Sequence, residues 1–151
     1  TTTAEALQRE LGLPLRTIGE FRNTLFDEEA SWQALGDALR SYDCPAKSLA
    51  DCTLLVTTGL NHWYRLTLAD FQHVVTVKLV APKRVLHQRR KTRSPHDDGW
   101  FPYHITRRQF IEMAQPLVAK LPADLTFDTS KTSTTEIVAA ISAHIRAAIK
   151  A

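Results

Sequence analysis

The chain has 151 residues, of which 44% are hydrophobic and 23% charged, and this length and balance suit one compact domain with a single core. Its net charge of +3 suits small anionic ligands but falls short of that of a dedicated nucleic-acid binder, so we expect no nucleic-acid partner. No apolar run approaches the roughly 20 residues that cross a membrane. We therefore expect no membrane partner. The two cysteines are too few for a disulfide framework, so we expect a cytoplasmic protein with reduced thiols.

The first half of the chain alternates between helical and strand patterns. Ala4, Leu7 and Leu11 share one face of a helix, and Gly12 follows where a left-handed C-terminal cap is favoured. The first predicted helix covers residues 1–11, a second follows a turn at residues 19–22, and a third has acidic residues 27–29 in its first turn and continues to residue 42. The predicted strands cover residues 15–18 and 52–57. The second strand is apolar without alternation, a pattern typical of a parallel strand that is buried on both faces.

The second half repeats this alternation. Strands are predicted at residues 74–80 and 125–128, and helices at residues 82–92, from 107 onward and from 134 onward. Capping boxes are predicted at Thr106 with Gln109 and at Ser133 with Glu136. Pro116 is expected to kink or end its helix early. Strands that alternate with helices in this way predict an α/β domain over residues 1–151, with a parallel sheet covered by helices on both faces.

Five segments resemble the P-loop kinases of nucleoside monophosphates and small molecules, and two of them are residues 54–61, like the third strand of these enzymes, and residues 123–130, like their final strand. The strand, Ala81-Pro82 turn and basic helix of residues 78–93 resemble the elements that lead into the lid of these enzymes. Residues 17–22 resemble their acceptor-site motif, in which an arginine holds the acceptor phosphate. Residues 1–14 resemble the helix that follows the phosphate-binding loop, although the loop G-x-x-x-x-G-K-[ST] is not in the chain. The resemblance implies a three-layer P-loop kinase fold whose first strand and P-loop are missing.

The resemblance also implies roles for individual residues. Thr1 would bind Mg²⁺, and Thr1 and Thr2 would lie at the nucleotide phosphates. Arg89 and Arg93, four residues apart and so on one helical face, would bind ATP and stabilise the transferred phosphoryl group. Glu20, Arg22 and Arg107 would hold the acceptor, and residues 89–108 would form the lid.

The expected function is therefore ATP-dependent phosphoryl transfer to a nucleotide or small metabolite. One position departs from the family, because Thr58 stands where an acid commonly helps to arrange Mg²⁺. Without the P-loop lysine, the 151 residues are not expected to turn over ATP. An alternative is a non-catalytic module that binds a nucleotide or another polyanion. A sheet that lacks its central strand exposes two edges, which would favour a homo-oligomer.

Overall fold

The computed structural model describes residues 2–25, 27–93, 99–100 and 105–150, and they form a mixed α/β structure with seven α-helices. The chain divides into two compact units. The first unit comprises residues 1–75 and 134–151, and the second comprises residues 76–133. The prediction of one domain with a lid over residues 89–108 stays a prediction.

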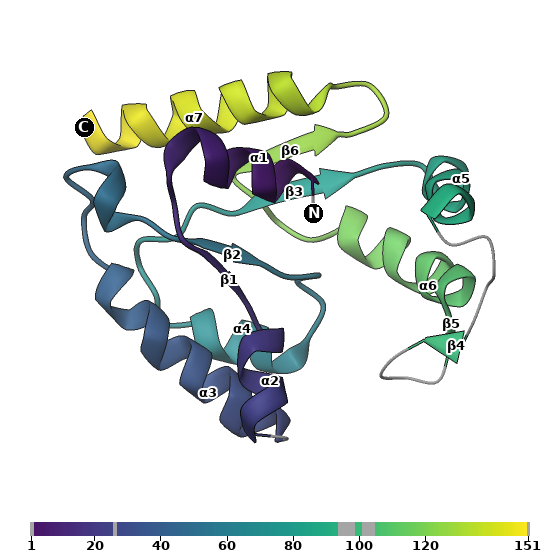
Figure 1. Ribbon diagram of the computed structural model, residues 1–151, viewed down its shortest axis with the longest axis horizontal. Helices are drawn as coiled ribbons and strands as arrows, with labels where there is room; N and C mark the ends of the chain where they lie inside the picture. The colour runs from purple at the N-terminus through teal and green to yellow at the C-terminus, as the bar shows by residue number, and fades with distance from the viewer. Residues whose placement is uncertain (1, 26, 94–98, 101–104, 151) are drawn as a thin grey trace. The chain divides into compact units, whose positions relative to one another are not determined.

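The first unit contains five helices and one parallel pair of strands (Figure 1). Its elements are α1 (Thr2–Leu11), β1 (Leu15–Thr17), α2 (Gly19–Leu25), α3 (Glu28–Leu39), β2 (Leu54–Val56), α4 (His62–Leu68) and α7 (Thr134–Lys150), with 3₁₀ turns at Arg40–Tyr42 and Leu49–Asp51. The core of this unit is built on Trp32, Leu35 and Leu39 of α3. The side chains that pack against them are Ile18, Phe21, Leu55, Trp63, Tyr64, Leu68 and Phe71.

Helices α1 and α7 lie side by side within the first unit, although they stand at opposite ends of the chain (Figure 1). Leu7 and Leu11 of α1 are buried, as are Ile137 and Ile141 of α7. The i, i+4 spacing of each pair gives both helices an apolar face, and we attribute their packing to the burial of these faces. The last helix of the chain thus returns to the unit in which the first begins.

The second unit carries a parallel pair of strands and two longer helices. Its elements are β3 (Val77–Val80), α5 (Lys83–Arg93), β4 (Gly99–Trp100), β5 (Ile105–Thr106), α6 (Arg107–Ala119) and β6 (Leu125–Asp128). Among its described residues only Ala81 and Ala114 are fully buried hydrophobics. A unit with so little buried apolar surface is expected to depend on polar contacts between its elements.

The described strands form three separate two-stranded sheets rather than the single sheet that we expected. β1 pairs in parallel with β2 from Leu15 opposite Leu54 onward, and β3 pairs in parallel with β6 from Val77 opposite Leu125 onward. β4 and β5 form a short antiparallel pair. The expectation that residues 52–57 are buried on both faces is wrong, because all six are only half-buried. A strand with a neighbour on one edge alone keeps more of its surface accessible.

Several local predictions are confirmed. Gly12 has φ +68° just after α1, as a left-handed cap requires. Thr106 and Gln109 form the predicted capping box at the start of α6. Pro116 does not end its helix at once, because α6 continues to Ala119. Among the described residues, no helix is long and apolar enough to span a membrane.

Candidate functional site

The predicted ligand-binding residues follow the carboxyl ends of parallel strands. In the first unit, α2 with Glu20 and Arg22 follows β1, and the loop with Thr58 follows β2. In the second unit, α5 with Arg89 follows β3. Ligands of open α/β sheets bind outside the carboxyl ends of the strands, so these positions suit ligand binding.

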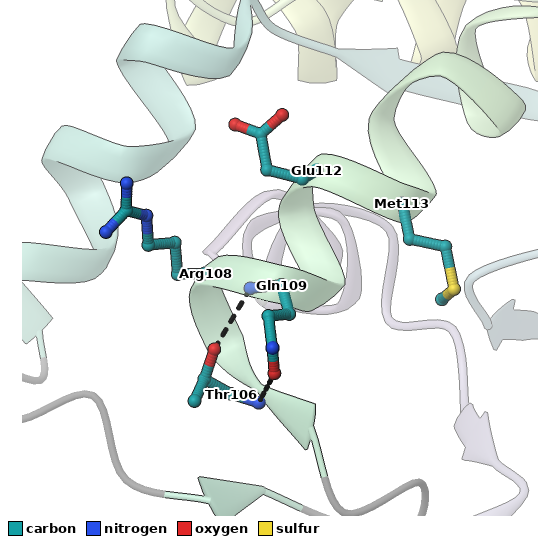
Figure 2. Close-up of a pocket in the computed structure, with 5 residues that line it drawn as sticks. All are labelled: Thr106, Arg108, Gln109, Glu112 and Met113. Carbon is teal, nitrogen blue, oxygen red and sulfur yellow. Dashed lines mark hydrogen bonds between the residues drawn. The ribbon is translucent and has the colours of Figure 1, made fainter.

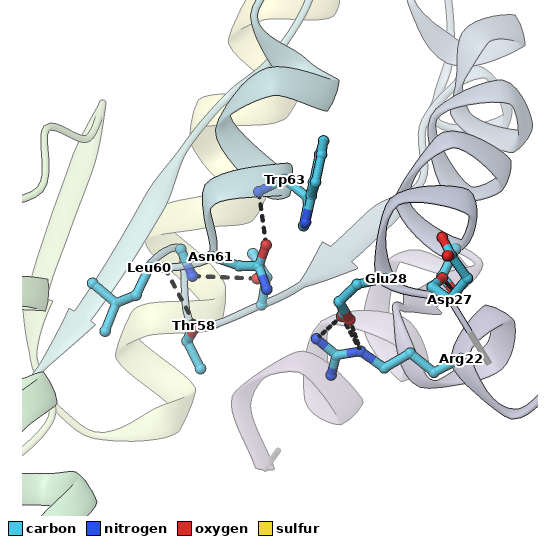
Figure 3. Close-up of polar contacts among 10 residues, drawn as sticks. Arg22, Asp27, Glu28, Thr58, Leu60, Asn61 and Trp63 are labelled. Carbon is cyan, nitrogen blue, oxygen red and sulfur yellow. Dashed lines mark hydrogen bonds and ion pairs between the residues drawn. The ribbon is translucent and has the colours of Figure 1, made fainter. Parts of the chain in front are cut away.

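Arg22 is held by a carboxylate of the first unit (Figure 3). Its Nε donates to Oε1 and Oε2 of Glu28 at 2.6 and 2.9 Å, and its Nη2 lies 2.5 Å from Oε1. Glu28 is the first residue of α3, whose N-cap is Asp27. Both members of the pair are partly exposed, at 34% and 40% of their side-chain surface. The predicted phosphate-binding group thus already holds an anion from its own chain.

Glu20 takes part in a different contact. Its Oε1 accepts a hydrogen bond from the backbone N–H of Thr17 at 3.3 Å, and its Oε2 pairs with Arg16 at 3.2 Å. The first bond satisfies a backbone donor just before α2, where a carboxylate also complements the helix dipole. These contacts account for Glu20 as a structural residue, and its role towards an acceptor stays a prediction.

The loop after β2 is shaped by hydroxyl and amide side chains (Figure 3). The Oγ1 atom of Thr58 accepts from the N–H of Leu60 at 3.3 Å, and the side chain of Asn61 caps α4 by accepting from the N–H of Trp63 at 2.8 Å. Gly59 has φ +75°, which a residue with a side chain rarely adopts. Trp63 itself packs against the core rather than standing free.

Arg89 joins α5 to the loop after β6. Its Nη1 donates to Oγ1 of Thr129 at 2.7 Å and its Nη2 donates to the carbonyl of Thr129 at 3.0 Å. Next to this contact, the hydroxyl and then the N–H of Ser130 donate to Asp128, and these bonds lower the pKa of the Asp128 carboxyl. Arg93, one turn further along α5, is exposed. One of the two predicted lid arginines therefore also holds the unit together.

The other predicted site residues lie at the ends of helices or outside the described residues. Thr1 lies outside the described residues, and of Thr2 only the backbone is described, as the first residue of α1. Arg107 is the first residue of α6. The predicted lid lies partly outside the described residues. No three carboxylate, imidazole or thiol side chains gather as a metal site in the described part of the chain, and the binding of Mg²⁺ by Thr1 stays a prediction.

A polar cluster that sequence reasoning missed ties α5 to α6. Glu112 accepts from Lys83 at 3.0 Å and lies 2.7 Å from Nε2 of His87. The hydrogen bond with His87, followed by that from Lys83, lowers the pKa of the Glu112 carboxyl. Nδ1 of His87 is buried and has no hydrogen-bond partner among the described atoms. The partners lie 25 or more residues apart on two helices, so spacing along the sequence gives no signal for them.

An open pocket of about 690 Å³ lies beside the start of α6, lined by Thr106, Arg108, Gln109, Glu112 and Met113. Figure 2 shows these side chains spread around the helix rather than converging on one point. Thr106 and Gln109 are occupied with each other in the capping box. Thr106 and Arg108 belong to the predicted lid, but none of the five lining residues is a predicted catalytic, nucleotide-binding or acceptor-binding residue.

Charge is divided unequally along the chain. Residues 76–133 hold eleven Lys or Arg and five Asp or Glu, a formal net charge of +6. The other residues hold eight Lys or Arg and eleven Asp or Glu, a formal net charge of −3. The modest total of +3 therefore conceals a strongly basic second unit and an acidic first unit.

No protein family, curated protein or solved structure matches this chain. The likeness to P-loop kinases accordingly stays a prediction that rests on the motifs quoted above.

Proposed function

We propose that this chain is the greater part of an ATP-dependent phosphotransferase that acts on a nucleotide or another small metabolite. The observation that carries the proposal is the position of Arg22 and Arg89, each on a helix that directly follows the carboxyl end of a parallel strand. These are positions at which open α/β sheets bind ligands, and guanidinium groups match phosphate geometry.

The strand pairing adds support. The resemblance places a missing first strand in the sheet, and β1 and β2 each keep one edge without a partner among the described strands. The half-buried state of β2 agrees with a sheet that has room for a further strand.

In this mechanism Arg22 binds the anionic acceptor, and Arg89 and Arg93 stabilise charge on the transferred phosphoryl group. Arg22 must exchange Glu28 for the acceptor phosphate. ATP supplies the phosphoryl group. Thr1 would offer a hydroxyl to Mg²⁺, but Thr58 offers a hydroxyl where the family has an acid, so we assign Thr58 no step that involves the metal.

Titration of the 151-residue chain with MgATP tests the binding half of the proposal. Arg93→Ala should weaken ATP binding about tenfold, because a charge-assisted hydrogen bond contributes about 1.5–3 kcal/mol. Arg84→Ala is the matched control, since Arg84 is exposed on the same helix but nearly opposite Arg93. Equal binding by wild type and both variants would contradict the proposal.

Turnover requires the phosphate-binding loop, which the resemblance places directly before Thr1. The protein should therefore be made with the residues that its coding sequence places there, and phosphoryl transfer to nucleoside monophosphates followed by ³¹P NMR. A Gly-rich loop that ends in Lys, together with transfer, supports the kinase. Absence of that loop, or no transfer to any acceptor, contradicts it.

A second candidate is a non-catalytic module that binds a nucleotide or another polyanion. Two observations favour it: the acid position is Thr58, and the acceptor-binding Arg22 already holds Glu28. This candidate predicts ATP binding that depends on Arg93 without phosphoryl transfer. The two experiments above therefore separate the candidates.

A further inference from the structure

Helix α5 is unusually rich in cations. Its eleven residues, Lys83–Arg93, include six Lys or Arg and no Asp or Glu. Solvated helix faces commonly carry charges of both signs, because i, i+4 pairs of opposite charge stabilise a helix and like pairs destabilise it. The cations of α5 therefore repel one another, and the helix has no acidic residue of its own to offset this repulsion.

Only some of the six cations of α5 form contacts that the structure describes within the second unit. Lys83 pairs with Glu112, and Arg89 donates both of its bonds to Thr129. Arg84 and Lys91 are exposed, and neither forms an ion pair with any residue that the structure describes. These two cations are thus available to a partner.

Arg84 and Lys91 share one face of α5. They are seven residues apart, close to two turns, which separates them by about 10.5 Å along the helix. Gln88 lies between them on the same face and is also exposed. We call Arg84, Gln88 and Lys91 the outer face of α5. This face is nearly opposite Arg93, so it is separate from the residues of the proposed kinase site.

We propose that the outer face of α5 binds the phosphate backbone of nucleic acid without sequence preference. Duplex DNA carries one negative charge per about 1.7 Å of its axis, so the roughly 10.5 Å between Arg84 and Lys91 spans several phosphates, and each of the two long side chains can reach one. The amide of Gln88 adds a neutral donor of the kind that contacts phosphate oxygens. The total charge of +3 led us to expect no nucleic-acid partner, but the second unit alone carries +6, and this local excess attracts such a polyanion.

The outer face fits nucleic acid better than a lipid surface. A helix that lies on a membrane presents large apolar side chains beside its cations. The outer face of α5 has none, since its three members are arginine, glutamine and lysine. This proposal goes beyond the proposed function, and it needs neither ATP nor an acceptor.

Fluorescence anisotropy with a labelled 20-base-pair DNA duplex tests the proposal on the whole chain. Arg84→Gln with Lys91→Gln should weaken binding at least tenfold at 50 mM salt. It should also reduce the slope of log K against log salt by about 1.8, since each phosphate contact contributes about 0.9. Glutamine keeps the side chains long, and circular dichroism confirms that the variant is folded.

The matched control is Arg65→Gln with Arg146→Gln. It removes the same charge from two exposed positions of the first unit and should leave binding within twofold of wild type. Equal losses in both double variants would mean that net charge alone attracts DNA, and would overturn the proposal. So would no binding by wild type, or binding to phosphatidylserine vesicles but not to DNA. The Arg84 and Lys91 variant should still bind MgATP as wild type does, so failure here is distinguishable from failure of the kinase proposal.

Discussion

Arg89 and Thr129 are 40 residues apart in sequence and are joined by two hydrogen bonds, from Nη1 to the threonine hydroxyl and from Nη2 to its carbonyl. The same hydroxyl lies 3.3 Å from the carbonyl oxygen of Val80, to which the N–H of Thr129 also donates. One threonine therefore connects the end of β3, the loop after β6 and helix α5. Because the second unit has few buried apolar side chains, we expect these hydrogen bonds to contribute to holding its elements together.

Replacement of Thr129 by valine should lower the free energy of unfolding by about 1–2 kcal/mol, because it leaves a partly buried guanidinium without its hydroxyl acceptor. Thr129→Ser keeps the hydroxyl and should cost less. Thr126→Val is the control, since Thr126 is an exposed residue of β6. Urea unfolding followed by circular dichroism measures all three, and a Thr129→Val variant as stable as wild type would contradict the interpretation.

Asp43 should make stability depend on pH. Its carboxylate accepts from the N–H groups of His73 and Gln72 and lies 3.3 Å from Nδ1 of His73. The hydrogen bond from the His73 N–H is the main cause that holds the pKa of Asp43 below its ordinary value of 3.8. The stabilisation is therefore present above pH 3.8 and is lost as the pH falls through the lowered pKa.

Asp43→Asn should consequently be less stable than wild type at pH 6, and the difference should shrink as the pH falls below 3.8. Tryptophan fluorescence in urea at several pH values measures this difference, since Trp32 and Trp63 lie in the same unit. Asp37→Asn removes a charge from an exposed position on α3 and should change stability little at pH 6. A difference between Asp43→Asn and wild type that stays constant from pH 6 to pH 2.5 would be the contrary result.

The features that sequence predicted best are those decided by neighbouring residues. The left-handed cap at Gly12 and the capping box of Thr106 with Gln109 each depend on a few consecutive positions. The strand at Leu125–Asp128 was predicted with the same bounds, and its apolar residues alternate with polar ones as in a strand. Helix α4, His62–Leu68, was not predicted from the sequence.

Contacts between different helices and strands were the part that sequence could not supply. Arg22 was predicted as a phosphate ligand from its motif, but its partner Glu28 lies on the next helix, where no helical spacing identifies it. Likewise, the partners of Arg89 and Glu112 are set by the pairing of β3 with β6 and of α5 with α6. Which strands pair is decided by packing along the whole chain.

Gly36 offers a test of packing between α3 and α4. A Cβ atom added there would lie 2.8 Å from Cγ2 of Thr67, which is too close for van der Waals contact. Gly36→Ala alone should therefore gain little or lose stability, although alanine favours a helix by about 1 kcal/mol over glycine. Thr67→Ser removes the obstructing methyl group. In that background Gly36→Ala should stabilise the protein. Urea unfolding of the wild type, the two single variants and the double variant measures the coupling between the two positions. If the effects of the two substitutions simply add, the close contact is contradicted.

Glu28 should compete with external anions for Arg22. The pair is partly exposed, and pairs of this kind contribute about 0–1 kcal/mol, so removal of the competing charge should strengthen anion binding by up to about fivefold. Titration of Glu28→Gln with inorganic phosphate or a nucleoside monophosphate measures the effect. Glu29→Gln is the matched control, because Glu29 is the next residue of α3, is exposed and carries the same charge. If both variants strengthen binding equally, the cause is the general loss of negative charge. If only Glu28→Gln strengthens binding, and Arg22→Ala abolishes the gain, then Arg22 is the anion site and Glu28 competes with the anion for it.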